Sequence, residues 1–385
     1  MTQLTVTLPQ AVPSPFRIRQ LAGFVKEDEM TGKHIVVIGA GYAGLSAAAG
    51  IGRGPNRVTL IAPERRFAHR VRQHEIAVGR RVSRPDIAHV LRGRKVDHLP
   101  TRVVELDLAG RKVVTEDGKR IPYDTLVYAL GSQVAWSDVP GAAEHAYSAE
   151  QAEELHRRIT DAPAPGTIAV VGGGATGIEL ATELAEAHPS WQVRLVASGP
   201  VGGWLSARGR AHILAVLHRL RVQVDEARQV TAVTATGLQT PAGPIPADVV
   251  VWAGSLEPHP LAADSGLAVT ERGQAVVDDH LRSVSHPDVY VAGDAAATRV
   301  PGIGQLRMGC ATAQPQGRYL GKLLSGRTDK PFAFRYLTQC LSLGRGEALV
   351  QLIHGDDSMK PRVVTGAAGR LVKSAIVHAL PLSLR

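Results

Sequence analysis

The sequence predicts an α/β fold in which two similar units, each built on a parallel β-sheet, are joined to a smaller C-terminal part. A pattern of strand, glycine turn and helix begins at residue 34, and the same pattern is repeated from residue 167. A late apolar run at residues 288–292 is typical of a strand that returns to the first sheet. We therefore expect five segments: an extension (1–32), the first unit in two parts (33–150 and 285–330), the second unit (151–284) and a C-terminal interface or membrane-surface segment (331–385).

The first unit opens with a Val- and Ile-rich strand at residues 34–38, followed by the pattern G-x-G-x-x-G at Gly39, Gly41 and Gly44. In this context the first glycine allows a tight turn, the second lets a pyrophosphate approach the backbone, and the third lets the helix pack closely on the strand. The N–H groups at the start of the helix would bind the phosphates. The pattern predicts a dinucleotide site rather than an ordinary glycine-rich turn.

The second strand, residues 57–61, is not followed by the acidic residue that usually binds the ribose hydroxyls. Ala62 stands there instead. Either Glu64 takes this role from a shifted position, or backbone and water hold the ribose.

A basic segment follows this strand. Arg70 and Arg72 are candidate contacts to the pyrophosphate, because a guanidinium can bind it through paired hydrogen bonds. A solvated basic surface is the alternative for either arginine. His74 is a candidate neighbour of the bound cofactor, although a structural histidine is the more common case.

Residues 101–130 alternate between apolar and polar side chains and contain a DG turn, which predicts a small antiparallel sheet. Its final run returns to the parallel sheet and ends at Gly131. The polar stretch 141–160 is predicted to be helical, and 161–166 reads as a linker.

The second unit repeats the pattern, with a strand at residues 167–171 and a second G-x-G-x-x-G at Gly172, Gly174 and Gly177. Two such turns in one chain are far more specific than one. Its second strand, 192–196, is again followed by alanine and serine rather than by an acidic residue, and no arginine follows at once. These residues do not choose between NADH and NADPH.

Glu179 lies in the first turn of the second predicted helix. One interpretation is an acid that stabilises the helix dipole, and the other is a carboxylate near the nicotinamide end of a bound nucleotide. Asp294 follows Gly293 at the end of the late strand, where ligands bind in open α/β sheets.

Residues 307–325 are predicted to form a helix, and 331–351 two strands. At the end of the chain, apolar residues follow helical spacing on one side and polar residues lie opposite. This helix is expected to pack on the protein's own core, to lie on a membrane surface or to form a dimer contact. The apolar residues are Leu371, Val372, Ala375, Ile376, Ala379 and Leu380, and the polar ones are Arg370, Lys373, Ser374 and His378.

Composition narrows the class of protein. Lys and Arg exceed Asp and Glu by nine, but the charge is spread along the chain and aromatic residues make up only 4%, so a nucleic-acid-binding surface is not expected. The two cysteines form neither a zinc framework nor a C-x-x-C redox pair, and no metal site is expected. Without an apolar membrane span or a signal-peptide core, we expect a cytoplasmic protein, with peripheral contact at the inner face of the membrane left open.

Five stretches resemble flavoproteins with two dinucleotide-binding domains, particularly type II NADH:quinone oxidoreductases and apoptosis-inducing-factor-like oxidoreductases. They are GAGYAGLSAA (39–48), YDTLVYALGS (123–132), GGGATGIELATEL (172–184), ADVVVWAGS (247–255) and DVYVAGDAA (288–296). The resemblance implies two Rossmann-like domains, with FAD on the first and NAD(P)H on the second, and a C-terminal interface domain.

The resemblance also implies roles for individual residues. Glu179 would act as a proton relay near flavin and nicotinamide, with Gln314 and Gln316 as hydrogen-bonding groups beside the flavin. The quinone-side pattern A-Q-x-A-x-Q is only partly kept, because Ala311 and Pro315 depart from it. Taken together with the residue-based arguments, the expected cofactor-binding residues are Gly39, Gly41, Ala43, Gly44, Ala62, Arg70, Val103, Gly131, Gly172, Gly174, Gly177, Gly293 and Asp294.

The predicted function is therefore the transfer of hydride from NAD(P)H through FAD to a quinone or another small acceptor. Two alternatives remain. One is an FAD-dependent oxidase or reductase of an organic metabolite with a vestigial nicotinamide site, and the other is a flavin-bearing signalling protein whose redox state controls association. A homodimer is compatible with each of them.

Overall fold

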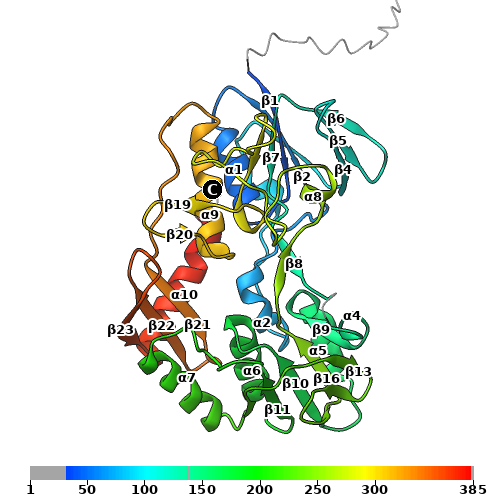
Figure 1. Ribbon diagram of the computed structural model, residues 1–385, viewed down its shortest axis with the longest axis vertical. Coiled ribbons are helices and arrows are strands. Elements are labelled where there is room, and N and C mark those ends of the chain that lie inside the picture. The colour runs from blue at the N-terminus through cyan, green and yellow to red at the C-terminus, as the bar shows by residue number, and fades with distance from the viewer. Residues whose placement is uncertain (1–31, 137–138, 383–385) are drawn as a thin grey trace, which may run out of the picture.

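The computed structural model describes residues 32–136 and 139–382, so nearly all of the predicted N-terminal extension lies outside the described residues. Two parallel sheets of five strands each form the upper and lower parts of the molecule in Figure 1. The predicted α/β class with two Rossmann-like units is confirmed.

The first sheet has the strand order β18-β7-β1-β2-β3, and all neighbouring strands are parallel. Alternate residues of β1 enter different apolar clusters, since Ile35 and Val37 pack on one face and Val36 and Ile38 on the other. This explains why the strand is a continuous apolar run. The strands are β1 (His34–Ile38), β2 (Arg57–Ile61), β3 (Val96–Leu99), β7 (Thr125–Tyr128) and β18 (Val289–Val291).

The second sheet has the order β12-β11-β10-β16-β9 and is also parallel. Its strands are β9 (Ala146–Ser148), β10 (Thr167–Val171), β11 (Gln192–Val196), β12 (Gln223–Asp225) and β16 (Val249–Trp252). The expectation that residues 141–160 are entirely helical is wrong, because β9 lies within them and pairs with β16. Three residues are too few to show a period, and their pairing partner lies about a hundred positions away in the chain.

Smaller antiparallel sheets accompany the two units. The sheet predicted within residues 101–130 is present as β4 (Val103–Asp107), β5 (Lys112–Thr115) and β6 (Arg120–Pro122). The second unit has a counterpart that the sequence did not predict, in β13 (Ala232–Thr234), β14 (Gly237–Gln239) and β15 (Ile245–Pro246). The pair β8 (Ser132–Val134) and β17 (Leu256–Pro258) runs between the units, and β19 (Arg299–Val300) pairs with β20 (Gly304–Gln305).

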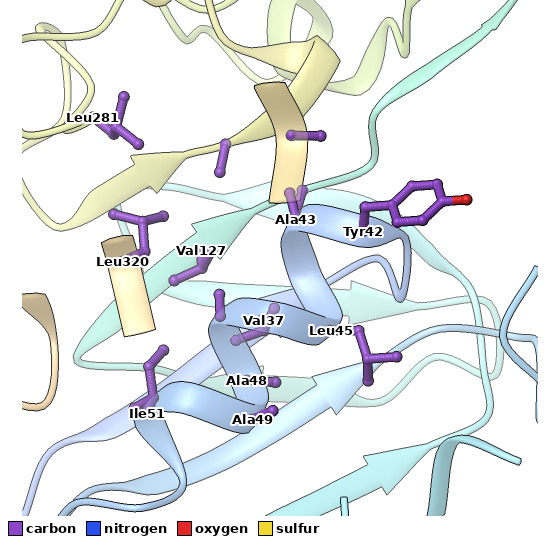
Figure 2. Close-up of a cluster of buried hydrophobic side chains, with 14 of the residues drawn as sticks. Val37, Tyr42, Ala43, Leu45, Ala48, Ala49, Ile51, Val127, Leu281 and Leu320 are labelled. Carbon is purple, nitrogen blue, oxygen red and sulfur yellow. The ribbon is translucent and has the colours of Figure 1, made fainter. Parts of the chain in front are cut away.

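Helix α1 (Tyr42–Ile51) packs against α9 (Cys310–Leu323), which confirms the helix predicted at 307–325. The two backbones approach so closely that a Cβ atom on Gly50 would lie 2.7 Å from the Cα of Gly321. Figure 2 shows Val37, Ala48 and Leu320 among the side chains that fill this core.

The remaining helical segments cover the sheets and connect the strands. They are α2 (Gln73–Ile76), α3 (Ile87–Val90), α4 (Ala142–His145), α5 (Ala152–Thr160), α6 (Ala175–Ala187), α7 (Ala207–Arg219), α8 (Leu261–Asp264) and the 3₁₀ turns η1 (Arg70–Arg72), η2 (Ala149–Gln151) and η3 (Gly293–Ala295).

The C-terminal part is an antiparallel sheet of three strands, β21 (Thr338–Ser342), β22 (Ala348–Ile353) and β23 (Met359–Val364), followed by α10 (Gly366–Leu382). The sequence predicted two of these strands and the helix. Helix α10 runs from this sheet toward α9 in Figure 1. No helix among the described residues is long and apolar enough to cross a membrane.

The orientation of α10 is opposite to the one expected for a helix packed on its own core. Gly369 and Val377 face inward and are buried, whereas the apolar Leu371 and Ile376 are 66% and 39% exposed. The prediction that this apolar face packs on the protein's own core is therefore wrong. The reason lies in the polar residue Lys373, which pairs with a buried carboxylate and so fixes the rotation of the helix.

Candidate cofactor and active site

The first glycine turn fits the role predicted for each of its glycines. Gly39 has φ +93°, and a Cβ atom there would lie 2.4 Å from the carbonyl oxygen of Ala129. At Gly44 a Cβ atom would lie 1.9 Å from the carbonyl oxygen of Gly39, so the helix packs directly on the turn. A Cβ atom on Gly41 would meet nothing within 4 Å. The backbone at Gly41 therefore faces open space that a bulky anion can approach.

The second turn has the same construction. Gly172 has φ +123° and Gly177 sits against its carbonyl oxygen, since a Cβ atom on Gly177 would lie 1.8 Å from it. A Cβ atom on Gly174 again meets nothing within 4 Å. The two glycine turns, which lie in different units of the chain, therefore form the same open backbone concavity, and each is called a cradle below.

Each cradle ends in uncapped helix N–H groups. The first main-chain bond of α1 joins the N–H of Leu45 to the carbonyl of Gly41 (3.0 Å), and that of α6 joins Ile178 to Gly174 (3.0 Å). Neither Gly41 nor Gly174 brings a side chain that could cap the helix. The free N–H groups and the helix dipole suit a pyrophosphate, so both cradles fit a dinucleotide such as FAD or NAD(P)H.

The second cradle opens into a cleft of about 640 Å³. The cleft is bordered by the glycine turn, by Ala197 and Ser198 at the end of β11, and by Trp204, Arg228 and Trp252. A concave site of this volume is of the size that holds a nucleotide.

Asp294 is held at the junction of three elements of the first unit. Its Oδ2 accepts a hydrogen bond from the Ser132 hydroxyl (2.7 Å), and its Oδ1 accepts one from the Gly309 N–H (2.7 Å), just before α9. The carboxylate therefore fixes the chain between β18, β8 and α9. Its predicted contact to the ribityl chain of FAD remains a prediction.

Gln314 and Gln316 are both buried in α9. The Oε1 of Gln316 accepts hydrogen bonds from the Gly293 N–H (2.8 Å) and the Thr298 hydroxyl (3.2 Å). Gln316 therefore holds the turn that carries Asp294, and its predicted hydrogen bond to the flavin remains a prediction.

The predicted arginine contacts are engaged with carboxylates. Arg70 donates to the carbonyl oxygen of Ser132 (3.0 Å) and to Glu150. Arg72 makes two bonds of 2.8 Å to Glu75. Arg70 lies beside the Ser132–Asp294 junction, while Arg72 belongs to a separate ion-pair network.

The other predicted cofactor residues lie around the first cradle. Ala43 is buried in the first turn of α1 and Gly131 has φ +69° after β7. Ala62 follows β2 and bonds through its N–H to Leu99 (3.2 Å), and Val103 begins β4. These positions are compatible with the roles that the resemblance implies.

The predicted proton relay, Glu179, is clasped by residues that the sequence did not connect with it. Its Oε1 accepts hydrogen bonds from the Lys373 ammonium (2.7 Å) and from the Ser342 N–H (2.9 Å). Lys373 also donates to the carbonyl of Cys340 (3.1 Å). The C-terminal sheet and α10 therefore close over the N-terminal half of α6, where Glu179 lies just after the first turn and not within it as predicted. The only signal for this contact in the sequence is the position of Lys373 on the polar face of the predicted C-terminal helix.

His74 completes this group. Its Nδ1 lies 3.7 Å from the Oε2 of Glu179, and its Nε2 has no hydrogen-bond partner among the described residues. Burial lowers the pKa of His74 to about 4, so the ring is neutral at pH 7. Burial alone would raise the pKa of Glu179, but Lys373, His74 and the hydrogen bond from the Ser342 N–H together outweigh it and lower that pKa below its usual range.

A second contact ties α10 to the first unit. His69 Nε2 lies 3.3 Å from the carbonyl oxygen of Val377, and its Nδ1 lies 2.7 Å from the hydroxyl of Tyr42 in the first turn of α1. Burial lowers the pKa of His69 to about 4 and raises that of Tyr42. Helix α10 thus contacts both units through buried polar groups.

An ion-pair network links α2, α6 and the turn between β21 and β22. Arg345 contacts Glu75 (3.1 Å) and also Glu183, which is 1% exposed. Burial opposes ionisation of Glu75, but Arg72 and Arg345 lower its pKa to about 2. This network holds His74 and Glu179 on neighbouring elements in a fixed arrangement.

Known proteins share both the sequence pattern and the fold. An NADH dehydrogenase-like protein of Mycobacterium tuberculosis is 30% identical over 376 residues, covering 89% of this chain and 92% of the relative. The type II NADH:quinone oxidoreductase Ndh of the same species is 27% identical over 322 residues, covering 70% and 69%. The structure of NDH2 from Plasmodium falciparum in complex with NADH matches with a TM-score of 0.79 at 14% identity, covering 91% of this chain and 96% of that one.

A family model described as pyridine nucleotide-disulphide oxidoreductase matches residues 33–317, which include both glycine cradles, Glu179 and Asp294. The chain therefore belongs to the pyridine nucleotide-disulphide oxidoreductase family and is an oxidoreductase that uses FAD and NAD(P)H.

Proposed function

We propose that this oxidoreductase passes two electrons from NAD(P)H through FAD to a quinone. The observation that carries the proposal is the buried Lys373–Glu179 pair, which lies between the second cradle and the C-terminal helix. A relative named as a type II NADH:quinone oxidoreductase supports the choice of acceptor.

The residues of this chain would bind and orient the reactants and move a proton. The first cradle, with Asp294, would hold FAD, and the second cradle would hold NAD(P)H. Bound flavin supplies the two-electron chemistry. Reduction of a quinone to a quinol takes two electrons and two protons, of which NAD(P)H supplies both electrons and one proton. The second proton comes from solvent.

Lys373 and Glu179 are suited to deliver that solvent proton. The Lys373 Nζ holds a proton 2.7 Å from the Glu179 Oε1, and both side chains are close to nine-tenths buried. Within such a pair a proton moves over a short distance without an ion being left unpaired. Neutral His74, on the other side of the carboxylate, adds a group that can accept or donate a proton.

Anaerobic stopped-flow mixing tests the proposal. NADH and NADPH are each mixed with the purified holoenzyme, and the reduced enzyme is then mixed with a water-soluble short-chain quinone. We expect the flavin absorbance to bleach in the first step and to recover in the second. Failure of both nucleotides to bleach the flavin would overturn the proposal, as would slow recovery with every quinone. Slow recovery together with a change of oligomeric state would favour a signalling protein.

We further propose that the exposed face of α10 contacts a membrane surface, where lipid-soluble quinones reside. This face, formed by Leu371, Val372 and Ile376, is 66%, 40% and 39% exposed at those residues. An amphipathic helix with an apolar face and neighbouring cationic side chains is suited to the interface of a bilayer.

Sedimentation with phospholipid vesicles tests this contact. The variant with Leu371→Ser and Ile376→Ser should lose binding, while Val284→Ser, which removes a residue 59% exposed elsewhere, should keep it. Absence of vesicle binding in the unmodified protein would contradict the proposal. Concentration-dependent dimerisation that the double variant abolishes would instead assign this face to a second copy.

A further inference from the structure

The cleft at the second cradle lacks the acidic group that would select NADH. In nucleotide-binding units of this kind, an acidic side chain at the end of the second strand accepts hydrogen bonds from the ribose 2′-hydroxyl and repels a 2′-phosphate. Here β11 is followed by Ala197 and Ser198, both of which border the cleft. No Asp or Glu is among the described residues that line it.

Arg228 is brought to this place by the loop after β12. Its backbone N–H donates to the carbonyl oxygen of Ala197 (2.9 Å), which sets the residue directly beside the end of β11. Arg228 also lines the cleft. Arg228 follows Ala197 by about thirty positions, so it does not belong to the residues just after β11 from which the coenzyme preference is usually predicted.

The carboxylates nearest to Arg228 in the chain are bound to other groups. Asp225 is paired with Arg194 (3.0 Å), and Glu226 accepts hydrogen bonds from Arg210 (2.7 Å) and from the Val201 N–H (2.7 Å). The Arg228 guanidinium has neither a hydrogen bond nor an ion pair with any described residue. The charges of Asp225 and Glu226 are balanced by Arg194 and Arg210. The charge of Arg228 is therefore left over and makes this end of the cleft positive.

We propose that Arg228 and Ser198 recognise the 2′-phosphate of NADPH, so that NADPH rather than NADH is the preferred reductant. The guanidinium can make paired charge-assisted hydrogen bonds to a phosphate, and the Ser198 hydroxyl can donate a further one. Ala197 leaves room for the phosphate and carries no opposing charge. The inference rests on the proposed use of the second cradle as the nicotinamide nucleotide site.

Binding of adenosine fragments tests the proposal without any turnover. Calorimetry of the holoenzyme should show adenosine 2′,5′-bisphosphate binding at least about tenfold more tightly than 5′-AMP, because one charge-assisted contact contributes more than about 1.4 kcal/mol. Arg228→Gln should abolish this difference. Arg208→Gln removes an exposed arginine of α7 that does not line the cleft, and it should leave the difference unchanged. Equal binding of the two fragments to the unmodified protein would overturn the proposal.

Flavin reduction by the two coenzymes separates this inference from the proposed function. We expect kcat/KM to be at least about tenfold higher with NADPH than with NADH, and Arg228→Gln to lower that ratio mainly through the KM for NADPH. Ala197→Asp should lower the ratio as well, because its carboxylate repels the phosphate. Reduction that is as fast or faster with NADH would overturn only the coenzyme preference. Reduction by neither coenzyme would overturn the proposed function itself.

Discussion

The ammonium of Lys373 lies 2.7 Å from a carboxylate oxygen of Glu179, although the two residues are separated by 194 positions in the chain. Glu179 lies just after the first turn of α6 in the second nucleotide-binding unit, and Lys373 belongs to the C-terminal helix. The pair therefore couples the position of α10 to the predicted nicotinamide site. It also explains why the apolar face of α10 points to solvent.

Replacement of Lys373 by methionine should destabilise the protein and raise the pKa of Glu179. The carboxylate would keep the Ser342 N–H but lose its counter-charge in a buried place. We expect a loss of about 3 kcal/mol in the free energy of unfolding at pH 7, measured by denaturant titration followed by circular dichroism.

The double variant Lys373→Met with Glu179→Gln is the matched control. It removes both charges together, so its stability should recover to within about 1 kcal/mol of the unmodified protein. If the losses in unfolding free energy of Lys373→Met and Glu179→Gln simply add in the double variant, the two side chains do not interact energetically. Quinone reduction should be slow in Lys373→Met, in Glu179→Gln and in the double variant if the pair relays the proton.

Stability should fall as the pH is lowered from 6.5 toward 4, because burial lowers the pKa of both His69 and His74 to about 4. Between these values the unfolded chain binds protons that the folded chain does not. The stabilisation is complete above pH 6.5 and is lost as the pH falls, by about 1.4 kcal/mol per pH unit for each histidine. Unfolding by denaturant at several pH values measures this slope.

The difference between each variant and the unmodified protein isolates the two histidines, since burial also lowers the pKa values of His34, His188 and His259. His69→Gln and His74→Gln should each flatten the slope. Glu75→Gln should lower stability without changing the slope above about pH 5.5, because an unfolded glutamate takes up protons only below that value, whereas folded Glu75, with its pKa lowered to about 2, stays ionised. Slopes that are the same in all variants would show that neither ring is held neutral.

Much of the fold could be predicted because its strands are buried on both faces. The runs at 34–38 and 167–171 are continuous and apolar for that reason, and the glycine turns after them have few alternatives. Strand β9 was missed because it is short and its pairing with β16 is distant in the chain. Local patterns carry little information about such pairings.

The same reasoning explains which parts of the site could be predicted. The glycines and Asp294 belong to local motifs whose geometry fixes their place. Lys373 and Arg228 reach the site from other elements, through the rotation of α10 and the loop after β12. The amphipathic pattern of α10 favours an orientation in which the apolar face is buried. The observed orientation is the opposite, because the ion pair between Lys373 and Glu179 outweighs the exposure of that face.

Replacement of Gln316 should lower the stability of the protein more than it lowers the rate of turnover. In Gln316→Met the buried Gly293 N–H loses its acceptor, and we expect a cost of about 2 kcal/mol. Thr298→Val removes only the weaker donor and should cost less than about 1 kcal/mol. Unchanged stability of Gln316→Met together with a large loss of turnover would instead favour direct contact with the flavin.

Two neighbouring glycines of the first turn should respond to alanine in opposite ways. A Cβ atom on Gly41 meets nothing within 4 Å, and its φ of −72° suits any residue, so Gly41→Ala should fold. The added methyl would occupy the approach to the backbone, and we expect the FAD content after desalting to fall at least about tenfold, since the pyrophosphate loses its close contact. In Gly44→Ala the methyl would lie 1.9 Å from the carbonyl oxygen of Gly39, so the first unit should fail to fold. Absorbance of bound flavin and circular dichroism of both variants separate these outcomes. A Gly41→Ala protein that retains its FAD would contradict the assignment of this cradle to the pyrophosphate.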